Sequence, residues 1–301
     1  MGKFKKSARE MYQESNQFQS LVRKDPVMQQ LMPSVFVTEN LPRNISTHAA
    51  GVVICGQPVD EYVPLSRASD GSITTQFTMT TLEELGLLKM DFLGLRTLTT
   101  IQRAVDMIAK NRGVTLDMAK IPLDDPASFQ LLNRGDTISV FQLESTGMRN
   151  LCRQFGVENI KHIIALIAIY RPGPMQFIDT FIARKRGKEE IIYDHPKMEE
   201  YLAETYGIML YQEQIMQVGQ VLAGFSLGGA GILRRAIGKK KADVLAEQKS
   251  KFVEGCAEFN NISEEVANSI WAKIETFAGY GFNKSHSAAY AFVAYRTAFL
   301  K

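Results

Sequence analysis

A single carboxylate, Asp91, stands among apolar side chains in the run GLLKMDFLGLR at residues 86–96. A charged group in such surroundings is costly to desolvate unless a cation or hydrogen bonds compensate. We predict that residues 87–92 form a buried strand in which Lys89 and Asp91 share one face. A carboxylate presented by a strand suits a metal ligand at an active site. The alternative is that Asp91 caps a helix starting near Leu95.

A second candidate site is the basic run that contains Arg234 and Arg235 and continues at Lys239, Lys240 and Lys241. Paired arginines bind phosphate oxygens through two hydrogen bonds at once, whereas lysines act as point charges. Neighbouring glycines let a ligand approach the backbone closely. The run therefore predicts phosphate binding, with a solvated basic face at a helix end as the alternative.

The third candidate is the loop GYGFNKSHS at residues 279–287. Its glycines, its aromatic rings, Lys284 and His286 suit it to stacking a base and contacting a phosphate. Asn283 and Tyr280 belong to the same loop. It is not a Walker loop, because the pattern GxxxxGK[ST] is not satisfied. For the histidine and the tyrosine, a structural role is the alternative.

The pattern of elements places these candidates in two kinds of structure. Short β-branched or alternating runs predict strands at residues 51–55, 73–78 and 87–92. Residues 1–32 have a helical pattern, which Pro33 is expected to end. From residue 97 the apolar period is helical, and helices are expected at 97–111, 125–133, 146–155, 159–170, 196–204, 210–224, 228–237, 242–259, 263–278 and 288–301. Strands followed by helices indicate an α+β protein with a boundary near residue 95.

The composition is that of a soluble globular protein, with 45% apolar and 22% charged residues. A chain of 301 residues can form two or more compact units. Its three cysteines, Cys55, Cys152 and Cys256, are far apart and form no CxxC pair. Neither a disulfide framework nor a zinc site is therefore predicted, and a cytoplasmic location is expected. The longest apolar stretch, residues 163–170, is too short to cross a bilayer, so no membrane partner is expected.

Seven short blocks follow one another in a distinctive order. They are HAAGVVI at 48–54, MDFLGLRTL at 90–98, VFQLES at 140–145, YRPGP at 170–174, LYQEQ at 210–214, LRRAIGKKK at 233–241 and GYGFNKSHSAAY at 279–290. Together they resemble the family C replicative DNA polymerases, the catalytic α subunits of bacterial DNA polymerase III. The resemblance extends from about Ala49 to Lys301 and is less distinctive over the first 45 residues.

The resemblance implies a fragment of a polymerase core. Residues 1–46 are similar to the end of the thumb, a helical arm. Residues 47–95 are similar to half of the palm, a small nucleotidyltransferase-type sheet. Residues 96–301 are similar to the helical fingers domain, truncated at its C-terminus. The implied reaction is template-directed nucleotidyl transfer from a dNTP to a primer 3′-OH with two Mg²⁺ ions. The implied partners are primer–template DNA, dNTP, the sliding clamp and other replisome subunits.

The resemblance also assigns roles to residues. Asp91 matches the third of three metal-binding, catalytic aspartates. The other two form an Asp-x-Asp pair that is absent before Asp91, so we expect the chain to be inactive alone. The residues implied to bind the nucleotide are Arg234, Arg235, Lys239, Lys284, Asn283 and Ser145. Those implied to bind DNA are Lys240, Lys241, His286 and Tyr280.

Two other functions are compatible with the sequence. A non-catalytic nucleic-acid or nucleotide-binding module uses the basic segments without using Asp91. A small helical interaction protein uses neither the basic segments nor Asp91 for binding, and its basic run is then a solvated helix face. In addition, His48 precedes the first predicted strand and Arg171 follows an apolar helix. Both are weaker candidates near the metal and the nucleotide, respectively.

Overall fold

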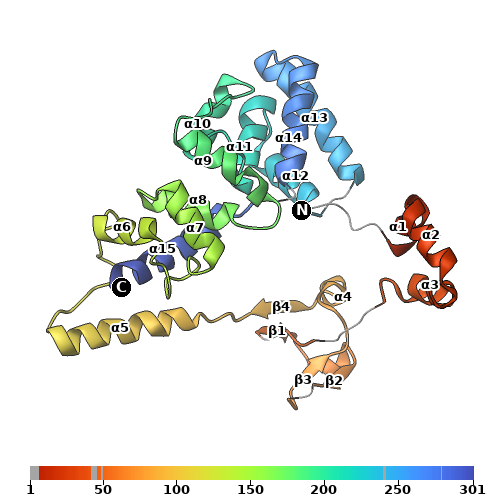
Figure 1. Cartoon of the computed structure of the whole chain (residues 1–301), viewed down its shortest axis with the longest axis horizontal. Coiled ribbons are helices and arrows are strands. Elements are labelled where there is room, and N and C mark those ends of the chain that lie inside the picture. Colours follow the sequence, from red (N-terminus) through yellow and green to blue (C-terminus); the bar gives the residue numbers. More distant parts are fainter. Residues whose placement is uncertain (1–6, 42–45, 49, 69, 240–241, 279) are drawn as a thin grey trace. The chain divides into compact units, whose positions relative to one another are not determined.

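The computed structural model describes residues 7–41, 46–48, 50–68, 70–239, 242–278 and 280–301 (Figure 1). The chain divides into two compact units, one ending at Arg96 and the other starting at Thr97. Within the described residues, the first unit contains four α-helices, a short 3-10 helix and the strands, whereas the second is helical.

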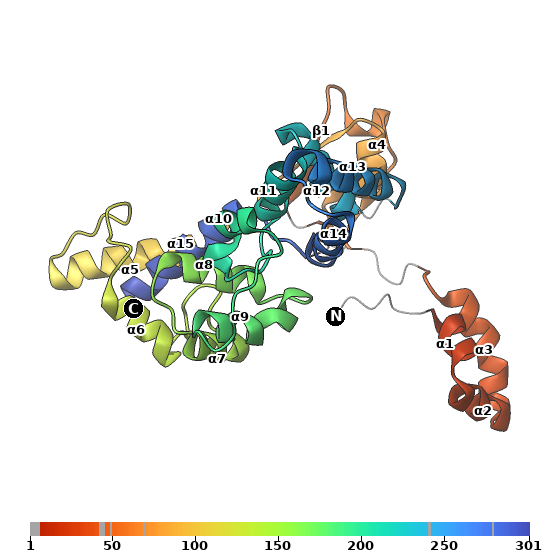
Figure 2. The ribbon, with the colours of Figure 1, turned by 90° about the horizontal axis from the view of Figure 1, so that it is seen from above.

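A bundle of three short helices starts the first unit, and its members lie side by side in Figure 2: α1 (Ala8–Glu14), α2 (Asn16–Lys24) and α3 (Pro26–Thr38). The Asp25 carboxylate accepts a hydrogen bond from the first turn of α3 and caps it. The predicted helix end at Pro33 is wrong, because α3 continues to Thr38. Pro33 is exposed, so the carbonyl that loses its amide partner can bind water instead.

Four short strands form two separate antiparallel pairs. β1 (Gly51–Ile54) pairs with β4 (Leu88–Asp91), and β2 (Leu65–Arg67) pairs with β3 (Ile73–Thr75). The three predicted strands overlap β1, β3 and β4. β2, with three residues, was not predicted, and neither were the short helices α4 (Met79–Glu84) and η1 (Val59–Glu61).

The prediction that β4 is a buried strand is wrong. Val52, Ile54, Leu88 and Met90 lie on one face of the β1–β4 pair, and all four are exposed. On the other face, Val53 packs against a small core that α4 completes. Because this core covers only one face of the strand pair, the side chains on the other face stay exposed to solvent.

Helices and turns form the second unit. The α-helices are α5 (Arg96–Arg112), α6 (Pro126–Arg134), α7 (Thr146–Phe155), α8 (Ile160–Ile169), α9 (Ile178–Lys185), α10 (Glu199–Leu202), α11 (Gln212–Ala223), α12 (Leu227–Lys239), α13 (Ala242–Asn260), α14 (Glu264–Ala278) and α15 (Lys284–Leu300). The 3-10 turns are η2 (Pro174–Phe177), η3 (Pro196–Met198) and η4 (Ala203–Thr205). Every predicted helix overlaps one of these, but α9 was not predicted, and α15 begins before the predicted residue 288.

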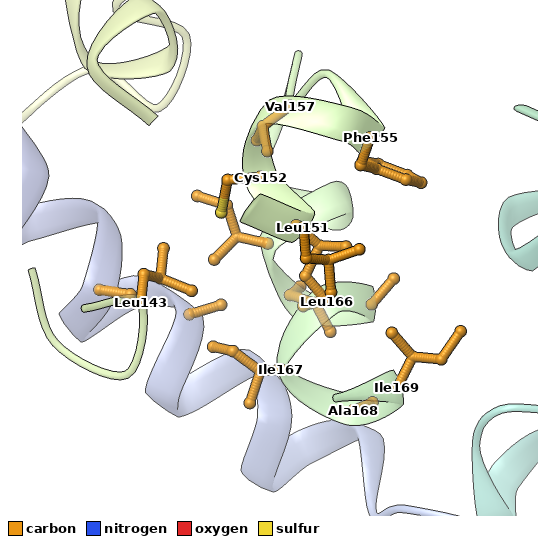
Figure 3. Close-up of a cluster of buried hydrophobic side chains, with 14 of the residues drawn as sticks. Leu143, Leu151, Cys152, Phe155, Val157, Leu166, Ile167, Ala168 and Ile169 are labelled. Atoms are coloured by element: carbon orange, nitrogen blue, oxygen red, sulfur yellow. The ribbon is translucent and has the colours of Figure 1, made fainter. Parts of the chain in front are cut away.

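The first hydrophobic core surrounds α8 (Figure 3). Its segment IIALIAI, residues 163–169, is apolar on every side, and all seven residues are buried. A helix without a polar face needs neighbours all round. α15 lies along α8, and the Ser287 hydroxyl donates to the Ile164 carbonyl at 2.6 Å. α7 contributes Cys152 and Phe155, both visible in Figure 3.

The second hydrophobic core lies among α11, α12, α13 and α14. Trp271 and Phe252 are fully buried there with their ring centroids 5.4 Å apart. Phe277 packs against both cores, so it joins the two halves of the helical unit. Small strand pairs followed by a helical unit confirm the predicted α+β class. The boundaries predicted for thumb, palm and fingers stay predictions.

Candidate functional site

Asp91 ends β4 and keeps a partly exposed carboxylate, with 43% of its side chain accessible. The Lys89 ammonium lies 2.5 Å from Asp91 Oδ1, in agreement with the prediction that both side chains share one face. This hydrogen bond and the lysine charge hold the pKa of Asp91 below its usual range. His48 Nδ1 is 3.9 Å from the same oxygen. Because His48 Nδ1 accepts a hydrogen bond from the Ala50 amide, this nitrogen does not donate one to Asp91.

Gly51 provides the room for this arrangement. It lies opposite Asp91 in the β1–β4 register. A Cβ at Gly51 would lie 2.6 Å from Lys89 Cε, 2.8 Å from His48 Nδ1 and 3.2 Å from Asp91 Oδ1. Any larger residue therefore displaces the lysine that neutralises Asp91.

A complete magnesium site is not formed by the residues that the structure describes. Hard divalent cations need several oxygen ligands. Asp91 supplies one carboxylate with a lysine against it, and the described part of the chain has no cluster of three potential metal ligands. The donor set around Asp91 thus fits one ligand of such a site.

The start of α15 is joined to the start of α11 in the helical unit. Phe282 forms an isolated parallel bridge with Tyr211. The Gln212 amide donates to the Phe282 carbonyl at 3.0 Å, and the Phe282 amide donates to the Leu210 carbonyl at 3.1 Å. The motifs LYQEQ and GYGFNKSHS are thus neighbours in space, although 65 and more residues separate them in the chain.

Asn283 and Lys284, both predicted to bind the nucleotide, have protein partners. Asn283 caps α15 through its Oδ1, and its amide group donates to Glu213 at 3.0 Å. The Lys284 backbone amide also donates to Glu213, at 3.0 Å. The Lys284 ammonium pairs with Glu204 and stands 5.3 Å from the centroid of the Tyr211 ring. Any ligand of this ammonium must share it with Glu204.

A line of planar groups in contact with one another runs along one side of α15. The Arg171 guanidinium lies over the Phe282 ring at 4.3 Å. The Phe282 and His286 ring centroids are 5.4 Å apart, and those of His286 and Tyr290 are 4.2 Å apart. Phe141 then lies 5.2 Å from Tyr290. We call these five groups the aromatic line. His286 and Arg171 are exposed, so two planar groups of the line are open to a ligand.

Tyr280, predicted to bind DNA, and Ser145, predicted to bind the nucleotide, make packing and capping contacts in this structure, and their binding roles stay predictions. The Tyr280 ring covers Gly173, where an added Cβ would lie 2.2 Å from it. The Ser145 hydroxyl caps α7 by accepting the Met148 amide at 3.3 Å. Phe282 was counted among the aromatic rings of the loop without a role of its own, and Tyr290 was not singled out from the sequence. Their four-residue spacing with His286 is the signal that could have placed all three on one side of a helix.

The predicted phosphate-binding arginines belong to α12. Leu233 and Ala236 anchor this helix in the second core, and Arg234 and Arg235 are exposed. Neither arginine has an ion-pair or hydrogen-bond partner among the described residues. Lys240 and Lys241 lie outside the described residues, as does the side chain of Lys239.

No helix in the described part of the chain is long and apolar enough to span a membrane. The profile of the bacterial DNA polymerase III alpha subunit finger domain matches residues 97–260. The profile of the bacterial DNA polymerase III alpha NTPase domain matches residues 2–94. Together these matches cover most of both units.

Curated relatives agree with these matches. The chain is 46% identical over 286 residues to DNA polymerase III subunit alpha of Aquifex aeolicus, which covers 94% of the chain and 24% of that protein. It is 51% identical over 264 residues to the Caulobacter vibrioides protein of the same name, which covers 87% of the chain and 23% of the relative. For the Bacillus subtilis protein the identity is 44% over 292 residues, or 97% of the chain and 26% of the relative.

The α+β unit and the helical unit are thus matched by two domain profiles of one family. The chain belongs to the bacterial DNA polymerase III alpha subunit family. It spans about a quarter of the length of the curated relatives that it matches. The resemblance predicted from the seven blocks is confirmed.

Proposed function

We propose that the chain is a catalytic-core part of a DNA-directed DNA polymerase that transfers a nucleotide from a dNTP to a primer 3′-OH. Family membership supports this reaction class, since the relatives are named DNA polymerase III subunit alpha. The observation that carries the proposal in the structure is the aromatic line on α15. Its exposed His286 and Arg171 offer a planar surface for a base or sugar beside a cation for phosphate.

The α12 arginines serve the triphosphate in this proposal. Arg234 and Arg235 are exposed and without described partners, so their guanidinium groups are available for bidentate contacts with phosphate oxygens. Lys239 is assigned to the same nucleotide, and Lys240 and Lys241 to the DNA backbone. Asn283, Lys284 and Ser145 act mainly by holding the starts of α15 and α7, because their side chains are engaged there.

Asp91 is the proposed catalytic residue and Mg²⁺ ligand. Bound divalent ions stabilise the negative charge on the attacking and leaving oxygens. The described residues supply one carboxylate for this site. We therefore propose that a two-metal site needs carboxylates from outside these 301 residues, and that the 301-residue chain alone does not extend a primer. A primer-extension assay with the chain alone tests this, and extension above background contradicts it.

DNA binding by the chain alone tests the basic segments. We expect fluorescently labelled primer–template DNA to bind, with an affinity that falls as salt rises. The double variant Arg234→Gln/Arg235→Gln is expected to weaken binding of dNTP and DNA, because it removes two exposed charges. Arg23→Gln/Lys24→Gln, a change of two exposed cations on α2, is the matched control. Equal affinities for both double variants contradict the assignment of the α12 arginines.

A second candidate function is a non-catalytic nucleotide or nucleic-acid-binding module. The observation that favours it is the ion pair between Asp91 and Lys89, which neutralises the proposed metal ligand. Under this function Asp91→Asn is neutral in every assay. Under the first function it abolishes polymerisation once the site is complete. The first proposal also includes binding to a sliding clamp and other replisome subunits in the bacterial cytoplasm. This part of the proposal rests on family membership alone.

A further inference from the structure

The helical unit contains a cavity of about 390 Å³ that is lined by residues of both hydrophobic cores. Among the described residues, none of those assigned above to metal, nucleotide or DNA lines it. Its volume lies within the range of about 300–1,000 Å³ that small-molecule sites occupy. The cavity is therefore large enough for an organic ligand that the polymerase reaction does not use.

Both apolar and charged side chains line this cavity. Phe177, Ile208, Met209 and Phe277 provide apolar walls. Two ion pairs also line the cavity. Arg184 Nε lies 2.9 Å from Glu189, and the Lys273 ammonium lies 2.6 and 2.8 Å from the two oxygens of Asp194.

Charge complementarity decides the class of ligand. Arg184 and Lys273 are already paired with carboxylates, so an anion has to displace Glu189 or Asp194, and a cation has to displace Arg184 or Lys273. An uncharged ligand leaves both ion pairs intact. The Thr180 hydroxyl lines the cavity without a hydrogen-bond partner among the described residues, so it can bind a polar group of the ligand.

We propose that this cavity binds an uncharged organic molecule with an apolar body and a hydrogen-bonding group. The apolar body packs against the aromatic and aliphatic lining, and the polar group hydrogen-bonds to Thr180.

An occupied cavity affects the neighbourhood of the aromatic line. The Phe177 and Phe277 ring centroids are 4.5 Å apart. The same two rings also line a small void of about 10 Å³ that reaches Tyr280. The Tyr280 amide donates to the Phe277 carbonyl at 2.9 Å. A ligand that fixes Phe277 therefore restrains Tyr280, and the consequence for nucleotide binding rests on the function proposed above.

Titration with prodan, an uncharged naphthalene ketone whose emission shifts to the blue in apolar surroundings, tests the binding site. The 301-residue chain is used without DNA, nucleotide or metal, so the result does not depend on polymerase function. We expect saturable binding with a blue shift and energy transfer from Trp271, the only tryptophan of the chain, which lies on α14 with Lys273. Thr180→Phe places a ring in the cavity and is expected to weaken binding at least tenfold.

Two further variants make the test specific. Thr276→Phe fills the cavity from α14 and is expected to weaken prodan binding as Thr180→Phe does. The test therefore needs only one of these two variants to fold. Thr99→Phe makes the same change at an exposed position of α5 and is the control. Absence of saturable binding overturns the proposal. So does binding that both cavity variants leave unchanged, since prodan then occupies another site.

Discussion

Gln214 provides the sharpest test of how the fold supports the site. Its side chain is buried and makes four hydrogen bonds. Oε1 accepts the Leu210 and Tyr211 amides, each at 2.9 Å, and Nε2 donates to the Tyr201 carbonyl at 3.0 Å and to Thr205 Oγ1 at 2.7 Å. These contacts hold the segment that pairs with Phe282 at the start of α15.

Gln214→Leu removes all four bonds and leaves two backbone amides buried without an acceptor. Each unsatisfied buried donor costs about 1–3 kcal/mol, so the free energy of unfolding should fall by about 4 kcal/mol. Urea unfolding followed by Trp271 fluorescence reports this change, because Trp271 lies in the second core with Met209. The loss is a large fraction of the roughly 5–15 kcal/mol typical of a domain.

Gln217→Leu is the matched control on the same helix. Gln217 is half-buried in α11, and no hydrogen bond of its side chain is observed among the described residues. Its replacement is expected to change the unfolding free energy by about 0.5 kcal/mol or less. If Gln214→Leu costs no more than Gln217→Leu, the reasoning about unsatisfied amides is refuted.

Two more predictions concern the cores. Burial and the Lys185 ammonium lower the pKa of His162 from 6.5 to about 4. The imidazole therefore binds a proton more tightly in the unfolded chain than in the folded one. As a result, the free energy of unfolding is expected to fall by about 3 kcal/mol as the pH drops from 6.5 to 4. Melting temperatures measured across this pH range check this prediction. His162→Gln is expected to reduce the dependence of the melting temperature on pH. If that dependence is the same in the variant, His162 is not its cause. Gly255→Ala places a Cβ 2.2 Å from the Ala223 carbonyl and should destabilise by about 2 kcal/mol or more in urea unfolding. Gly231→Ala, with open space around it on α12, should be neutral or stabilising by up to about 1 kcal/mol, and equal effects of the two changes contradict the packing argument.

The helices could be predicted because their local signals agree with their packing. In α8 the apolar run and the Asn159 cap both favour a helix, and the structure has one. Pro33 misled the prediction, since an exposed proline can be accommodated within α3. β4 was located correctly but judged buried, because a local pattern does not show how many layers cover a strand. Leu88 and Met90 are apolar and exposed for that reason.

The candidate site could be predicted less completely from the sequence than the helices. Lys284 and Asn283 look available in the loop motif, but Glu204 and Glu213 engage them from 70 to 80 residues away in the chain. Only the fold brings these carboxylates to α15. The pairing of Lys89 with Asp91 was foreseeable from strand alternation. The roles assigned to the nucleotide, DNA and metal ligands stay predictions.

The most direct measurement of the central claim is primer extension by a chimera. In it, this chain replaces the matching segment of the Bacillus subtilis DNA polymerase III subunit alpha, to which it is 44% identical. The chimera is expected to extend a primer, and Asp91→Asn to reduce the rate at least a hundredfold. Asp60→Asn, at an exposed aspartate of the same unit, is expected to leave the rate unchanged. An active chimera whose rate is the same with asparagine at position 91 contradicts the account.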